Sequence, residues 1–117
     1  MATERNYFGR SQDEWIDQVE SEARRDAVAL AVIVQQGKEG FHLQGEALTE
    51  FVRQVIEHLI AKGAQVVVGS KKPGIDWELA VEFDGSPADI ASQVLARWKQ
   101  SGTDQAYFAW FSYNAGR

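Results

Sequence analysis

The chain contains no cysteine, which excludes disulfide bridges, thiolate zinc sites and cysteine nucleophiles. Its two histidines, His42 and His58, are too few for the three or four ligands that usually converge on a metal. The catalytic and phosphate-binding patterns GxSxG, GxGxxG, HExxH and GxxxxGK[ST] are absent as well. We therefore expect no metal, no cofactor and no catalytic residue, and we favour a non-enzymatic protein over an enzyme.

Basic residues and long apolar runs are also scarce. The chain has 12 Lys and Arg against 17 Asp and Glu, a formal net charge of −5, which disfavours binding to the nucleic-acid backbone. No apolar run approaches the roughly 18 residues of a membrane span, and the first residues lack the charged-then-apolar pattern of a signal peptide. We expect a cytoplasmic protein that binds neither nucleic acid nor membrane and whose acidity suits a basic partner.

The length and composition are those of one ordinary globular domain. With 117 residues, 44% of them hydrophobic, the chain can bury a real core, and we expect a single α+β domain over residues 1–117. Residues 1–10 have no periodic pattern and are predicted to be an irregular lead-in.

Three segments have the apolar periodicity of amphipathic helices. They are residues 11–25, 46–63 and 86–102. Ser11 and Glu14 have the spacing of a capping box at the start of the first segment. The glycines Gly63 and Gly102 stand where the second and third helices should end.

Four segments have the composition of strands, and their order predicts the fold. They are residues 27–34, 64–70, 76–84 and 105–113. The first is apolar on both faces, as a central strand is, and a glycine-rich connection that suits a short hairpin follows it. After the first helix the order is β-α-β-β-α-β, which is typical of a ferredoxin-like antiparallel sheet with two long helices on one face.

The strand predicted at 76–84 separates apolar from acidic side chains, because successive side chains point to opposite faces. One face carries Trp77, Leu79, Val81 and Phe83, which we expect to meet the two long helices. The other, open face carries Asp76, Glu78, Ala80, Glu82 and Asp84. Glu78 and Glu82 would lie roughly 13 Å apart, at ~3.3 Å per residue, too far for a shared-proton pair. Solvation or ion pairs are their ordinary role.

The last predicted strand carries aromatic side chains on both of its faces, so one aromatic set must remain outside the core. In the ferredoxin-like order this strand is an edge beside the first strand, and the exposed set shares the open face with the carboxylates. The sequence therefore predicts a binding surface on that face. Its members are Glu78, Glu82, Tyr107, Trp110, Phe111 and Tyr113.

Three covers are conceivable for such a surface: the N-terminal helix, a second copy of the chain in a homodimer, or a protein partner. Trp15, Ile16 and Val19 form the apolar stripe that would make the N-terminal helix the first candidate. The leading hypothesis is a small acidic protein-interaction module of the toxin-neutralising or regulatory type. The alternative is a small-molecule-binding module or small enzyme, with a pocket for a cationic ligand between the sheet and the N-terminal helix.

Overall fold

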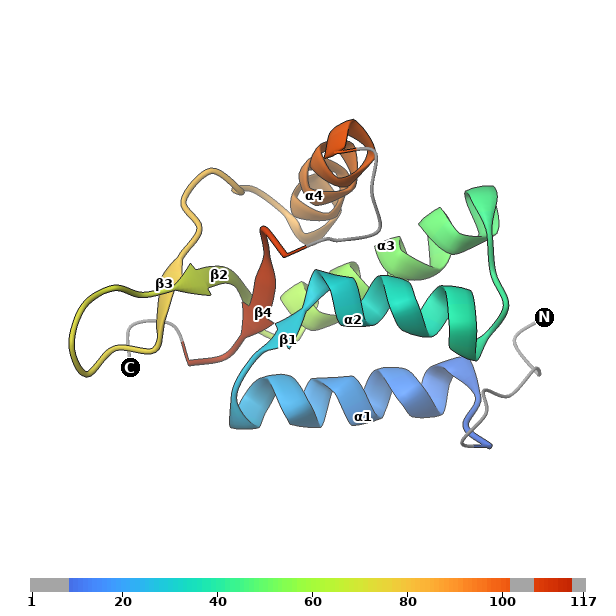
Figure 1. The fold of residues 1–117 in the computed structure, drawn as a ribbon, viewed down its shortest axis with the longest axis horizontal. Helices are drawn as coiled ribbons and strands as arrows, with labels where there is room; N and C mark the ends of the chain where they lie inside the picture. The colour runs from blue at the N-terminus through green and yellow to red at the C-terminus, as the bar shows by residue number, and fades with distance from the viewer. Residues whose placement is uncertain (1–8, 102–106, 115–117) are drawn as a thin grey trace.

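The computed structural model describes residues 9–101 and 107–114, which form an α+β fold with one four-stranded antiparallel sheet (Figure 1). The helical elements are α1 (Gln12–Arg25), α2 (Leu30–Gln35), the π-helical turn η1 (Gln36–Gly40), α3 (Gly45–Ala61) and α4 (Pro87–Ser101). The strands are β1 (Val28–Ala29), β2 (Gln65–Gly69), β3 (Trp77–Leu79) and β4 (Trp110–Ser112). The predicted lead-in up to residue 8, Gly102 and the first residues of the last predicted strand lie outside the described residues. No helix in the described part of the chain is long and apolar enough to cross a membrane.

Helix α1 begins with the predicted capping box. The Glu14 backbone N–H donates to Ser11 Oγ at 3.2 Å, and the Ser11 N–H donates to Glu14 Oε1 at 3.1 Å. Its buried residues lie in the hydrophobic core, where the ring of Trp15 is 5.7 Å from that of Phe51 in α3. The apolar stripe of α1 is therefore used inside the helical core.

The two long helices, α3 and α4, are close to their predicted positions and pack against each other. Gly63 has a φ of 107°, a left-handed conformation that ends α3 and favours glycine. At the start of α4 the Asp89 N–H donates to Ser86 Oγ, and the Ser86 N–H donates to Asp89 Oδ2, both at 3.1 Å. This second reciprocal cap fixes the point at which α4 begins.

The prediction of a central strand over 27–34 is wrong. Only Val28–Ala29 is strand, and the chain is helical from Leu30 through η1, so no hairpin follows. The burial pattern gives the reason: four apolar residues of α2 are buried while Val32 is 44% exposed, which is a helical spacing. A short apolar run fits a buried helix as well as a buried strand, so its periodicity could not decide between them.

The strand order is β1-β4-β2-β3, which is not the ferredoxin-like order. β4 is not an edge strand, because Phe111 pairs with Val28 of β1 on one side and with Val66 of β2 on the other. β1, which ends where the chain becomes helical, forms one edge of the sheet and β3 forms the other, with β4 and β2 between them.

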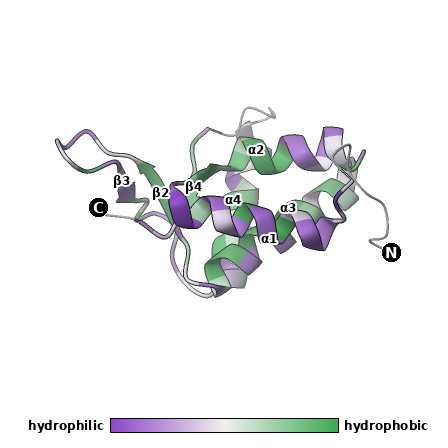
Figure 2. Ribbon diagram, turned by 90° about the horizontal axis from the view of Figure 1, so that it is seen from below, coloured by the Kyte–Doolittle hydropathy of each residue, from purple (hydrophilic) through white to green (hydrophobic). Residues whose placement is uncertain are grey.

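The two faces of the sheet differ in what covers them. Residues paired across neighbouring strands share a face. Val28, Phe111, Val66 and Ala80 share the face that is buried in the core with the helices. In Figure 2 the hydrophobic colour runs through β2, β4 and the first turn of α2, whereas α1 shows the mixed colours of an amphipathic helix.

The opposite face carries Trp77 and Leu79, and this overturns the prediction that they meet the helices. Leu79 pairs with Val67, which pairs in turn with Trp110, so all three share the face turned away from the core. Ala80, predicted on the open face, is buried and its N–H donates to Val66 O at 2.9 Å. β3 ends at Leu79 because the chain turns towards α4 there, so the predicted alternation does not continue to residue 84.

Candidate functional site

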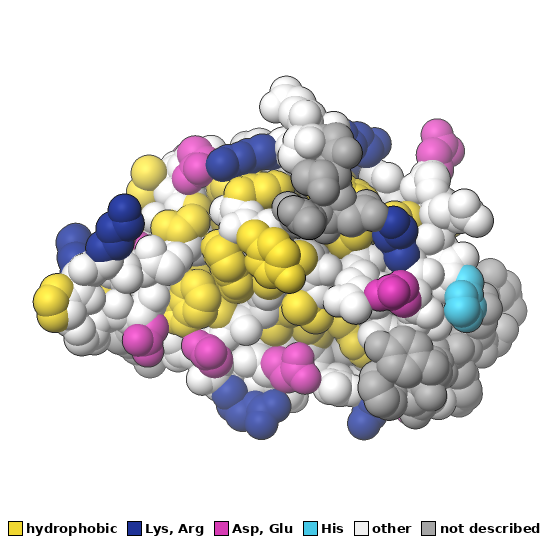
Figure 3. All heavy atoms as spheres, viewed as in Figure 1, with side chains coloured by type: hydrophobic (Ala, Val, Ile, Leu, Met, Phe, Trp, Pro, Cys, Tyr) yellow, Lys and Arg dark blue, Asp and Glu magenta, His cyan; other side chains and the backbone are white. Residues whose placement is uncertain are grey.

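An aromatic patch lies on the sheet face turned away from the core. We call it the open-face patch, and its members are Trp77, Leu79, Tyr107 and Trp110. The ring of Trp110 is 5.7 Å from that of Trp77 and 6.4 Å from that of Tyr107. Leu79 is 50% exposed and Tyr107 is 62% exposed, although both are large and largely apolar. In Figure 3 the hydrophobic side chains gather over the sheet in this view.

The apolar sequence of β2 explains why a patch forms on this side. Val66 faces the helices, so the next residue, Val67, must face the opposite way. Val67 is nevertheless fully buried, since its two cross-strand neighbours are Leu79 and Trp110. The indole N–H of Trp77 donates to Asp26 Oδ1 at 2.8 Å, which fixes the orientation of that ring. The patch is therefore an ordered layer with its own small apolar centre.

A second aromatic group adjoins a charged pair. The rings of Phe83 and Phe108 are 6.4 Å apart, and the guanidinium of Arg97 lies 4.7 Å from the Phe108 ring and 5.9 Å from the Phe83 ring. Arg97 Nη1 also contacts Glu82 Oε2 at 2.8 Å. Arg97 thus places its charge over two ring faces while it pairs with a carboxylate.

The predicted aromatic site residues divide into two members of the open-face patch and two residues that pack against the helices. Tyr107 and Trp110 belong to the open-face patch, as described above. Phe111 is fully buried in the core, so it offers no surface to a partner. Tyr113 lies past the end of β4, with its hydroxyl 3.5 Å from Leu59 O and the Arg24 guanidinium 4.1 Å from its ring centre. Tyr113 therefore closes the sheet against the ends of α1 and α3.

The predicted acidic site residues take separate basic partners. Glu78 lies opposite Val68 in β2 and forms an ion pair with Lys72 at 3.3 Å. Glu82 follows β3 in a turn and pairs with Arg97. This arrangement agrees with the ordinary ion-pair role and offers no acid–base pair. Glu78 also lies on the opposite face of β3 from Leu79, so it does not belong to the patch.

Trp77 and Leu79 are the patch residues that sequence reasoning missed, and Val81, also predicted to meet the helices, is 84% exposed. The alternation in this segment correctly separates apolar from acidic side chains. However, alternation gives no signal for which of two faces meets the helices, and the rule that apolar residues turn inward selected the wrong one.

A polar network joins α1, α3 and the end of the sheet. His58 Nε2 lies 2.8 Å from Glu20 Oε1, and Arg24 pairs with Glu20 Oε2 at 3.3 Å. The hydrogen bond from His58 lowers the pKa of Glu20, and burial raises the pKa of Tyr113. Within the described residues no group of three or more potential metal ligands exists. The contact between His58 and Glu20 links α3 to α1.

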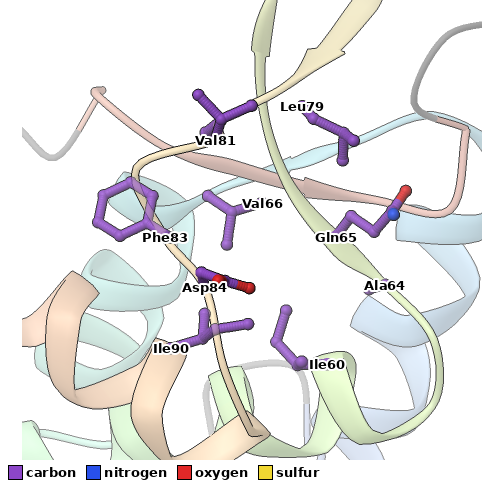
Figure 4. Close-up of a pocket in the computed structure, with 10 residues that line it drawn as sticks. Ile60, Ala64, Gln65, Val66, Leu79, Val81, Phe83, Asp84 and Ile90 are labelled. Atoms are coloured by element: carbon purple, nitrogen blue, oxygen red, sulfur yellow. The ribbon is translucent and has the colours of Figure 1, made fainter.

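A pocket of about 380 Å³ lies where β3 ends and the chain crosses to α4 (Figure 4). Its walls are mainly apolar and include Ile60, Val66, Phe83 and Ile90. The carboxylate of Asp84 lies among these side chains in the close-up. The volume is at the small end of the range for ligand sites. No residue of α1 lines it, so it is not the predicted pocket beneath the N-terminal helix.

No protein-family model, no curated protein and no solved structure matches this chain. The chemistry of its surfaces is therefore the basis for any functional conclusion.

Proposed function

We propose that this chain is a non-enzymatic protein-interaction module, of the toxin-neutralising or regulatory type, that binds its partner through the open-face patch. The observation that carries this proposal is the row of contacting rings of Trp77, Trp110 and Tyr107, with the exposed Leu79 and Tyr107, on the sheet face turned away from the core. Tryptophan and tyrosine are the most common anchors of protein interfaces, because they bury a large area at a small cost in conformational entropy.

The N-terminal helix does not compete for the patch. The apolar residues of α1 are already buried in the helical core, with Trp15 against Phe51. Its C-cap, Asp26, reaches the patch through the hydrogen bond to the Trp77 indole. In the described part of the chain α1 therefore leaves Leu79 and Tyr107 exposed, and contiguous apolar patches of this kind commonly mark interaction sites.

The charge of the chain favours a basic partner. The net charge is −5, and Asp26 lies at the edge of the patch beside Trp77. Asp76, which precedes Trp77 in the chain, is exposed and makes no ion pair with another described residue. Carboxylates around an apolar centre steer a positively charged surface towards it and accelerate association.

Native mass spectrometry of the chain purified from its own source tests this function. We expect a stoichiometric complex with one other protein, lost in Trp110→Ser and kept in the control Ala47→Ser, which introduces the same residue at an exposed position early in α3. A homodimer that Trp110→Ser dissociates would assign the patch to self-association instead. A complex that survives Trp110→Ser would contradict the proposal.

A second candidate function follows from the pocket beside α4. The Asp84 carboxylate among apolar side chains favours a small amine with an apolar body, which could also lie against the Phe83 ring. A thermal-shift screen of alkyl and aryl amines should then find compounds that raise the melting temperature of the wild type and not of Asp84→Asn. Equal shifts in the two proteins, or none in either, would contradict this function.

A further inference from the structure

The edge strand β3 has backbone groups that pair with no other strand in the described residues. On its inner side the Ala80 N–H donates to Val66 O at 2.9 Å, and Asp76 O accepts from the Ser70 N–H at 3.0 Å. Antiparallel pairs alternate between hydrogen-bonded and non-hydrogen-bonded, so the even-numbered residues of this segment face β2. The N–H and C=O groups of Trp77 and Leu79 consequently point outward from the sheet.

These outward backbone groups lie directly beside the open-face patch, because the side chains of Trp77 and Leu79 are two of its four members. A strand added at this edge would satisfy both N–H groups and both C=O groups. The residues opposite Trp77 and Leu79 would place their side chains on the open face, next to the exposed part of Leu79. The residue between them would lie opposite Glu78, on the other face.

The charges at this edge select the kind of strand. A second copy paired antiparallel about Glu78 would place two Glu78 carboxylates opposite each other. Pairing centred on Trp77 would place Asp76 opposite Glu78. Like charges directly opposite destabilise a sheet. A foreign strand with a basic residue at that position would instead complement two carboxylates, those of Glu78 and of the exposed Asp76. Glu78 is paired at present with the largely exposed Lys72.

We propose that β3 binds an extended segment of the partner as a fifth strand of the sheet. This proposal rests on the interaction function proposed above and specifies how the partner binds. The segment alternates apolar and basic residues. Its apolar side chains extend the open-face patch past Leu79, and a lysine or arginine between them lies opposite Glu78. Main-chain hydrogen bonds to Trp77 and Leu79 hold the segment, and the alternating side chains set its specificity.

A short peptide of alternating valine and lysine, blocked at both ends, is the probe. In titrations of the isotope-labelled protein followed by NMR, we expect the Trp77 and Leu79 amide signals to shift and their hydrogen exchange to slow. The valines that face Trp77 and Leu79 donate their N–H groups to β3. N-methylation of the valines should therefore weaken binding by at least about tenfold, because two hydrogen bonds are lost. N-methylation of the lysines, whose N–H groups point away, is the matched control and should leave binding within about twofold.

Substitutions in the protein test the same geometry from the other side. Leu79→Pro removes an outward N–H donor without breaking the ladder to β2 and should abolish peptide binding. Leu79→Ala keeps the donor and should bind the peptide more tightly than Leu79→Pro does. Glu78→Gln should weaken the peptide about two- to fivefold. Absence of binding at millimolar peptide, or equal binding of the two N-methylated peptides, would overturn the proposal. Neither result would contradict the proposed function, which is tested by the effect of Trp110→Ser on the natural complex.

Discussion

The indole ring of Trp77 lies 5.7 Å from that of Trp110, although their strands, β3 and β4, are separated by β2. The two rings meet across β2, on the face of that strand that carries Val67. Val67 is fully buried there. An aromatic layer thus takes the place of a covering helix on this face of the sheet. The two rings that stabilise this layer are half-buried, and the exposed side chains of Leu79 and Tyr107 lie beside them.

The coupling between Trp77 and Trp110 can be measured in a double-mutant cycle. Each change to alanine should lower the free energy of unfolding by about 1–3 kcal/mol, less than for a wholly buried tryptophan, since both rings are half-buried. The coupling energy should be about 0.5–1.5 kcal/mol, the range for aromatic pairs in contact. Urea denaturation of the four proteins measures it. Additivity within about 0.3 kcal/mol would contradict the ring contact.

The two aromatic residues predicted to share a surface, Tyr107 and Phe111, should behave in opposite ways. Phe111 is fully buried, so Phe111→Ala should cost about 3–5 kcal/mol of unfolding free energy. Tyr107 is 62% exposed, so Tyr107→Ala should cost less than about 1 kcal/mol. Thermal and urea unfolding of the two variants give the comparison. A small loss for Phe111→Ala would show that the inward set of β4 has been assigned incorrectly.

Helix α1, and the element predicted as the central strand, show what local sequence could and could not reveal. The capping box at Ser11 and Glu14 is a local device, so its spacing identified the start of α1 correctly. In contrast, residues 27–34 are all apolar, and such a run fits a buried helix or a buried strand equally well. Tertiary packing, in which α2 contacts α3, decides between them, and no local signal reports it.

The structure agrees with the predicted surface at some residues and differs at others: Phe111 is fully buried, and Glu82 follows the end of β3. The sequence indicated an aromatic surface on one face of the sheet and identified Tyr107 and Trp110 as members. It could not reveal that Trp77 and Leu79 join them, because the direction of a strand face depends on register with distant strands. Ala80 and Val66 are joined by a hydrogen bond, and that register turns Leu79 away from the helices.

The pair of Glu20 and His58 predicts a pH dependence on the acid side. The hydrogen bond from His58 lowers the pKa of Glu20 below its value in the unfolded chain. The stabilisation is therefore fully present above the unfolded-state pKa, about 4.3, and is lost as the pH falls through the lower folded-state value. Urea denaturation at a series of acidic pH values should show a smaller acid-side loss in Glu20→Gln than in the wild type. Parallel profiles would contradict the linkage.

Arg97 should matter more than its ion-pair partner Glu82. Replacing Arg97 by alanine removes contacts with two rings and one carboxylate, and should cost about 1–2 kcal/mol. Glu82→Gln removes only a surface ion pair and should cost less than about 1 kcal/mol, a loss that salt reduces. Chemical denaturation at low and high salt separates the two effects. Equal losses in the two variants would indicate that the rings contribute nothing to the position of Arg97.

The most direct test of the central claim is the affinity of the natural partner for Trp110→Ser, measured by calorimetry against wild type and Ala47→Ser. If the open-face patch is the binding surface, loss of the middle ring should weaken binding by about thirtyfold or more, the effect of an interface hot spot. Ala47→Ser should bind as the wild type does. Equal affinities of all three proteins, with Trp110→Ser still folded, would contradict the assignment of the open-face patch as the site of interaction.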